Sequence, residues 1–165
     1  MNDIVGKTIE MNIKDLIGFQ INSKGYFTRM DIVIKKMALE EILGKNKIGL
    51  DFYRKMYSKL CAASNKKIEG RIANLKSLSN KIEKKTFNSK KHPILLTPKN
   101  NIWDGSHRIV CAYYYGHSSI WIRGIKREFK KGNDFGMNRF KNKFNESELK
   151  IILENQNEMF EKLKI

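Results

Sequence analysis

An apolar pair, an aspartate-glycine step and three polar residues follow one another in the segment Ile102-Trp103-Asp104-Gly105-Ser106-His107-Arg108. The apolar pair is typical of a short strand, and the run from Ser106 to Tyr115, which ends before Gly116, predicts a helix. Glycine allows a sharp backbone turn, and serine is a common helix N-cap. The segment therefore predicts a strand, a tight turn at Gly105 and a helix capped by Ser106.

The residues of this turn suit a phosphate group. Free backbone N–H groups and the positive end of the helix dipole favour an anion at the start of a helix. Arg108 adds a guanidinium fork for phosphate oxygens, and His107 adds a titratable donor. The segment alone leaves open the alternative of a capped turn in which Arg108 is only a solvated helix residue.

Short strands and helices are expected on both sides of the turn. Apolar spacing and turn residues predict strands within 9–16 and over 93–96, 102–103 and 120–122, and helices over 30–42, 50–62, 71–84, 106–115 and 147–164. The strands at 93–96 and 102–103 are expected to form a hairpin. Because helices and strands alternate without a regular period, we expect an α+β fold with a small mixed sheet. The length of 165 residues suits a single domain over 1–165.

The charge of the chain is strongly positive, since 33 lysine and arginine residues oppose 17 aspartate and glutamate residues, for a formal net charge of +16. The basic residues are mostly lysines spread from Lys7 to Lys164. Three interpretations stay open: an AT-biased genome, an anionic small substrate or membrane surface, and nucleic acid. A dedicated nucleic-acid binder more often clusters arginine and exposed aromatic residues, so nucleic acid is not favoured.

The sequence predicts a protein of the cytoplasm. No apolar stretch approaches the roughly 20 residues of a membrane span, and the N-terminus lacks the order of a signal peptide. Cys61 and Cys111 lie in contexts that predict buried, reduced thiols and show no metal-type spacing. His92 and His117 also have no partner at such spacing, and we expect them at the surface.

The turn and much of the chain around it resemble the ParB/sulfiredoxin superfamily, in particular small proteins encoded among surface-polysaccharide genes. The upstream part of the resemblance consists of Arg29-x-Asp31, Ile34-Lys35, Met37-Ala38-Leu39-Glu40, Gly44-Lys45-Asn46, Gly49 and Leu50 to Met56 with Tyr53. The downstream part is Phe135-Gly136-Met137-Asn138-x-Phe140. Lys35 departs from an expected arginine, and Arg139 departs from a usual tryptophan.

The turn residues indicate which branch of the superfamily is most similar. Sulfiredoxin has a catalytic cysteine in the turn, where this chain has Ser106, and partitioning ParB proteins have a glutamate-arginine-arginine version. The Asp-Gly-x-His-Arg form is similar to the free serine kinases. The resemblance thus implies an enzyme, a nucleotide-dependent phosphotransferase that acts on a hydroxyl of a small molecule or glycan precursor in surface-polysaccharide biosynthesis. The alternatives are a ParB-like nucleic-acid-binding or nuclease module and a scaffold without turnover.

The resemblance also implies a role for each site residue. Gly105, Ser106, His107 and Arg108 would bind the phosphates of ATP or ADP, and Asp104 would hold Mg²⁺. Glu40, Asp104 and His107 would be catalytic, with Glu40 as the general base. Arg29, Asp31 and Lys35 would bind the substrate.

Two of these assignments compete with ordinary structural roles. Glu40 lies close to Val33 around the expected helix, on a partly apolar stripe where a carboxylate would be desolvated, as a general base requires. It could equally be a boundary residue paired with Lys36. Arg29 and Asp31 could equally belong to the start of a helix, where aspartate complements the dipole.

Overall fold

Four strands form one mixed sheet in the computed structural model, which describes residues 4–129 and 135–165. The strands are β1 (Thr8–Asn12), β2 (Ile94–Leu96), β3 (Ile102–Asp104) and β4 (Ser119–Gly124), in the order β1-β4-β2-β3. Strand β4 pairs antiparallel with β1 and parallel with β2, and β2 pairs antiparallel with β3. The predicted small mixed sheet and its hairpin are confirmed.

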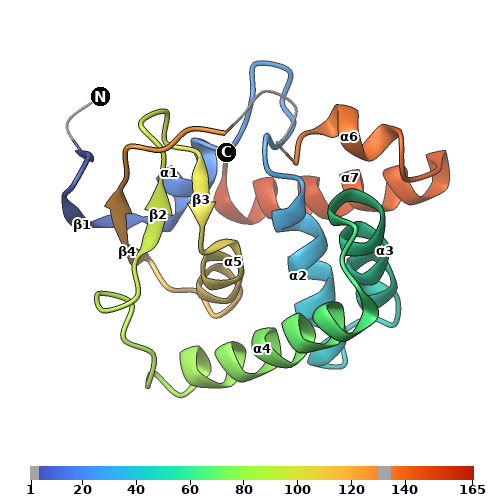
Figure 1. Cartoon of the computed structure of the whole chain (residues 1–165), viewed down its shortest axis with the longest axis horizontal. Coiled ribbons are helices and arrows are strands. Elements are labelled where there is room, and N and C mark those ends of the chain that lie inside the picture. Colours follow the sequence, from blue (N-terminus) through green and yellow to red (C-terminus); the bar gives the residue numbers. More distant parts are fainter. Residues whose placement is uncertain (1–3, 130–134) are drawn as a thin grey trace.

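Seven helices accompany the sheet within the described residues. They are α1 (Ile13–Gly18), α2 (Asp31–Ile42), α3 (Gly49–Cys61), α4 (Asn65–Glu83), α5 (Ser106–Tyr114), α6 (Met137–Lys141) and α7 (Glu146–Leu163). Figure 1 shows the sheet on one side of the molecule, α2 and α3 on the other, and α4 along the lower edge. The predicted α+β class and the C-terminal helix are confirmed.

Helix α2 is the central helix of the fold. Every residue from Asp31 to Leu39 is buried, which means that this helix is covered on all sides. A Cβ atom at Gly49 would lie 2.0 Å from the carbonyl oxygen of Met37. Glycine therefore lets the start of α3 approach α2 closely.

The structure differs from the sequence-based expectations at several points. The strand within 9–16 ends at Asn12 and is followed directly by α1, α6 was not expected, and α4 begins at Asn65 instead of residue 71. Cys111 is buried as predicted, but Cys61 is exposed because it ends α3, so the prediction of a buried thiol was wrong there.

In the described parts of the chain, no helix is long and apolar enough to cross a membrane.

Candidate functional site

The turn between β3 and α5 has the backbone geometry that only glycine adopts easily. Gly105 has a φ of 105° and is itself the N-cap of α5, while Ser106 is the first helical residue. The expectation that Ser106 caps the helix was wrong, because its hydroxyl is engaged elsewhere. A Cβ atom at Gly105 would lie 3.0 Å from Cγ1 of Ile94 and 3.2 Å from Cζ of Arg108. The turn is thus pressed against β2 and its own arginine.

A buried ion network holds this turn to the first turn of α2. The Nζ of Lys35 donates to the Oγ of Ser106 at 2.5 Å and to a carboxylate oxygen of Asp31 at 2.5 Å. Arg29 donates to both Asp31 oxygens at 2.7 and 2.8 Å and also to the carbonyl oxygen of Ile102 in β3. The three charged side chains expected to bind substrate therefore lie together and link α2, β3 and α5.

The charges of this network compensate one another inside the protein. Burial by itself would raise the pKa of Asp31, but the cations of Arg29 and Lys35 outweigh burial and hold that pKa well below its usual value. Asp31 is completely buried, and Arg29 and Lys35 are nearly so. The carboxylate is therefore ionised at neutral pH, and its partners keep it so.

His107 is the second residue of α5 and contacts Tyr53 of α3. Its Nε2 shares a 2.8 Å hydrogen bond with the hydroxyl of Tyr53, which is fully buried. Burial, together with the nearby positive charges of Lys35 and Arg71, lowers the pKa of His107 well below its usual value. The imidazole is therefore neutral at pH 7.

This neutral histidine predicts a pH dependence of stability. Below about pH 6.5 the unfolded chain protonates His107 while the folded chain does not, so the free energy of unfolding should fall as pH is lowered from about 7 to about 5, by up to about 1.4 kcal/mol per pH unit. Urea denaturation at several pH values measures this slope. His107→Gln should flatten the slope, and the exposed His117→Gln should leave it unchanged. Equal slopes in wild type and His107→Gln would contradict the assignment.

Three hydrogen bonds hold the side chain of Arg108 beside the turn. Its Nη1 donates to the carbonyl oxygens of His92, at 2.7 Å, and Pro93, and its Nη2 donates to Oδ2 of Asp104 at 2.6 Å. The side chain of Arg108 is 17% exposed and that of Asp104 is 64% exposed. The pair is therefore pre-positioned and still open to solvent.

A shallow hollow of about 540 Å³ opens beside this pair. The residues around it come from α4, from the connector between α4 and β2 (residues 84–93), from β2 and from the turn. They are Asn74, Leu78, Phe87, Lys91, His92, Pro93, Leu95, Asp104 and Arg108. Its charged side chains are Lys91, Arg108 and Asp104. The hollow is large enough for a phosphate-bearing small molecule and is positive on balance.

Asp104 would supply only one of the ligands that a Mg²⁺ ion needs, so a bound phosphate and water would have to supply the others. In residues 4–129 and 135–165, no group of three or more histidine, cysteine or acidic side chains gathers in a way that could hold a metal ion. Mg²⁺ commonly binds one or two carboxylates and takes its other ligands from water and substrate phosphates. The single exposed carboxylate of Asp104 would match that pattern with a phosphate ligand beside it.

Glu40 lies away from the turn. From Asp31, which is tied to Ser106 through Lys35, helix α2 rises by about 13 Å before it reaches Glu40. The carboxylate of Glu40 pairs with Lys36 at 2.9 Å. Burial, together with the negative charge of Glu40, raises the pKa of Tyr113 at the far end of α5. The structure brings Glu40 into a boundary ion pair with Lys36 and does not bring it to the turn at Gly105.

The sequence did not indicate that the connector after α4 belongs to this site. His92 is exposed as expected, but its backbone carbonyl anchors Arg108 and its ring stacks on Phe87. Lys91 and Asn74 also lie at the hollow. The only signal for this placement is the proline-led strand β2, which returns the connector to the side of α5.

No family model, no curated protein and no solved structure matches this chain.

Proposed function

We propose that the protein is a cytoplasmic, nucleotide-dependent phosphotransferase of the ParB/sulfiredoxin type, which phosphorylates a hydroxyl of a small molecule or glycan precursor in surface-polysaccharide biosynthesis. One observation carries the proposal: an Asp-Gly-Ser-His-Arg turn starts a nine-residue helix, with Asp104 and Arg108 at the edge of an open, positive hollow. The similarity of this turn to that of the free serine kinases gives the class of reaction.

The turn would bind the nucleotide through its phosphates. Backbone N–H groups at the start of α5 and the helix dipole favour the anion, and the guanidinium of Arg108 adds charge-assisted hydrogen bonds. Lys91, which also lines the hollow, adds a second positive charge. Asp104 would hold Mg²⁺, which supplies neutralisation of the charge on the transferring phosphoryl group.

The reaction would move the terminal phosphoryl group of ATP or ADP. The bond from phosphorus to the bridging oxygen of the nucleotide breaks, a bond from phosphorus to the acceptor oxygen forms, and the hydroxyl proton is released. Because the transition state is loose, positioning and charge stabilisation supply most of the catalysis. The pre-positioned Arg108 suits that requirement, and no step is assigned to Glu40.

The buried network has a positioning role in this proposal. Arg29, Asp31 and Lys35 are satisfied by one another, by Ser106 and by the carbonyl oxygen of Ile102. Their contacts keep β3 and α5 in register across the turn. We therefore expect them to support the site from within the fold.

Calorimetric titration of ATP, ADP and CTP with Mg²⁺ tests the proposal. At least one nucleotide should bind with a dissociation constant of about 1 mM or below, the common range for enzyme substrates. Asp104→Asn should weaken this binding in Mg²⁺ but not in excess chelator. Absence of binding of all three nucleotides at millimolar concentration would contradict the proposal.

A ParB-like nucleic-acid-binding or nuclease module is the second candidate. The observation that favours it is the row of lysines on α4 next to the hollow. Binding to phosphate backbones falls steeply with salt through counterion release. Duplex or single-strand binding that persists at about 150 mM salt would support this candidate over the first.

A further inference from the structure

Two more shallow hollows extend the Arg108 hollow along α4. They measure about 450 and 400 Å³. The two share Ser77, Lys81 and Thr86. The second of them shares four residues with the Arg108 hollow, namely Asn74, Leu78, Phe87 and His92. The three hollows therefore form one continuous surface, the α4 groove, which ends at the turn.

The α4 groove is positively charged along its length. Lys76, Lys81 and Lys84 line its outer part, and Lys91 lines the part next to the turn. The two outer hollows contain no carboxylate, and the one carboxylate of the third, Asp104, is paired with Arg108. Among the described residues, no salt bridge is formed by any of these four lysines. The groove thus presents uncompensated positive charge to whatever lies in it.

The shape of this charge indicates an extended ligand. In the larger outer hollow, the lining positions of α4 recur three or four residues apart, which places them on one side of the helix. They are Ala73, Lys76, Ser77, Asn80 and Lys81, and the C-cap residue Lys84 follows them. From the first to the last of these positions the helix rises by about 16 Å. Figure 1 shows α4 along the lower edge, with the connector rising from its C-terminal end to β2 beside α5. A chain molecule lying along α4 would pass beside the Arg108 hollow, which meets α4 at Asn74 and Leu78.

The uncharged lining residues favour a glycan over a nucleic acid. Amide and hydroxyl side chains such as Asn80, Ser77 and Thr86 can pair with sugar hydroxyls. The groove contains one aromatic side chain, Phe87, and that ring is already stacked on His92 with centroids 6.0 Å apart. Single-stranded nucleic acids are usually bound by stacking successive bases on open aromatic rings.

We propose that the α4 groove binds an extended anionic glycan and delivers one of its hydroxyl groups to the turn. The inference rests on the proposed phosphotransferase function and assigns the class of acceptor. The lysines would contact carboxylate or phosphate groups along the glycan, and the amide and hydroxyl side chains would contact its sugar hydroxyls. The nucleotide would remain bound at Arg108 and Asp104.

Binding of an acidic oligogalacturonate, measured by fluorescence anisotropy with nucleotide absent, tests the inference. Wild type should bind it at about 150 mM salt, and a neutral dextran oligosaccharide should not bind. The triple variant Lys76→Gln, Lys81→Gln, Lys84→Gln should lose at least about tenfold in affinity, because three counterion-releasing contacts are removed. The matched control, Lys24→Gln, Lys47→Gln, Lys150→Gln, changes the net charge equally at exposed sites outside the groove and should stay within about twofold.

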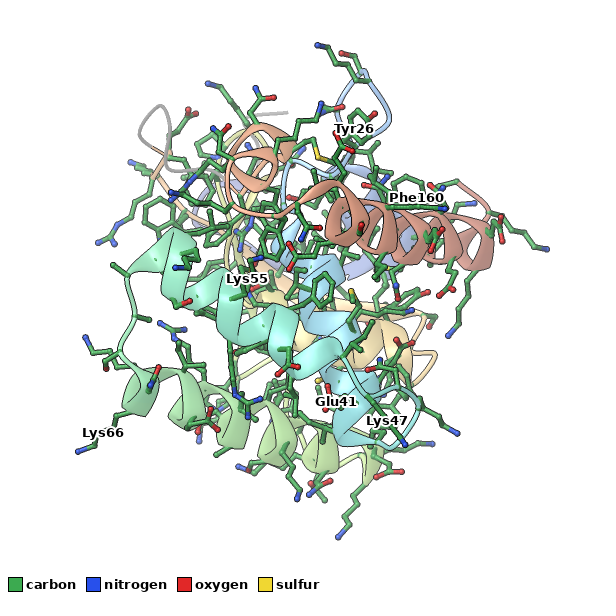
Figure 2. All side chains as sticks on the ribbon, turned by 90° about the vertical axis from the view of Figure 1, so that its right-hand side faces the viewer. Tyr26, Glu41, Lys47, Lys55, Lys66 and Phe160 are labelled. Atoms are coloured by element: carbon green, nitrogen blue, oxygen red, sulfur yellow. The ribbon has the colours of Figure 1, made fainter. Side chains whose placement is uncertain are left out.

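The outcomes separate this inference from the proposed function. Equal losses of affinity in the two triple variants, or no binding of the acidic glycan by wild type, would overturn the proposal that the groove binds a glycan, even if ATP binds normally. If single-stranded poly-dT of matched charge binds more tightly than the glycan, and the groove variant loses this binding, nucleic acid would replace the glycan as the ligand of the groove. Groove-dependent glycan binding would support the site even if nucleotide titration failed. Figure 2 shows Lys66 projecting into solvent at the N-terminal end of α4, away from the residues that line the groove.

Discussion

Asp31→Asn should lower the free energy of unfolding by about 3–5 kcal/mol, the usual result of breaking a buried ion network at one partner. The substitution leaves the cations of Arg29 and Lys35 buried without a compensating charge. The Nζ of Lys35 would lose its anionic partner and keep the hydroxyl of Ser106 and the ring of Tyr57, so the turn should loosen as well. Urea denaturation at pH 7 followed by circular dichroism measures the loss.

Asp51→Asn provides the matched control for Asp31→Asn. The side chain of Asp51 is 83% exposed and lies 3.6 Å from Arg54, so its loss should cost at most about 1 kcal/mol. The pH dependence gives a second criterion. Because folding lowers the pKa of Asp31, its contribution is present above about pH 3.9 and is lost as pH falls further, and Asp31→Asn should lack that component. An Asp31→Asn protein as stable as Asp51→Asn would contradict the network's role.

Arg108→Ala should weaken nucleotide binding by about 10- to 150-fold, which corresponds to about 1.5–3 kcal/mol for lost charge-assisted hydrogen bonds. The loss should appear in affinity, because the guanidinium would hold phosphate before and during transfer. Arg108→Lys should give an intermediate loss, since lysine keeps the charge but not the planar fork. Calorimetric titration with ATP and Mg²⁺ measures all three proteins.

Two variants control for indirect effects in that experiment. Arg123→Ala removes an exposed arginine on β4, and Glu40→Gln removes the carboxylate at the far part of α2. Both should bind nucleotide with wild-type affinity. Thermal unfolding of Arg108→Ala should be recorded in parallel, because Arg108 also anchors the carbonyl oxygens of His92 and Pro93. A folded Arg108→Ala protein with unchanged affinity would contradict the assignment.

Long helices and the hairpin could be predicted from the sequence because their signals are local. Apolar residues repeat at helical spacing in α2, α3 and α7, and turn residues separate β2 from β3. Helices α1 and α6 are too short to show a period. The N-terminal turns of α4 are polar, so its start at Asn65 was missed.

The turn between β3 and α5 was predictable, but its surroundings were not. Local sequence indicated an Asp-Gly turn before a helix, which the structure has between β3 and α5. The hydroxyl of Ser106 is held by Lys35, 71 positions earlier in the chain, and no local signal shows that this contact displaces an N-cap role. The family resemblance implied that Glu40 acts as a general base at the turn, but the length of α2 between Asp31 and Glu40 separates the two. Pairing of distant segments, here α2 with α5 and the connector with Arg108, depends on tertiary packing.

Backbone amide NMR during a titration with ADP and Mg²⁺ tests the central claim most directly, because it reports where a phosphate ligand binds. We expect the largest shift changes at Gly105, Ser106, His107 and Arg108, with smaller changes at Lys91 and His92 on the facing connector. Saturable changes confined to surfaces away from α5, or no change at millimolar ligand, would contradict the account.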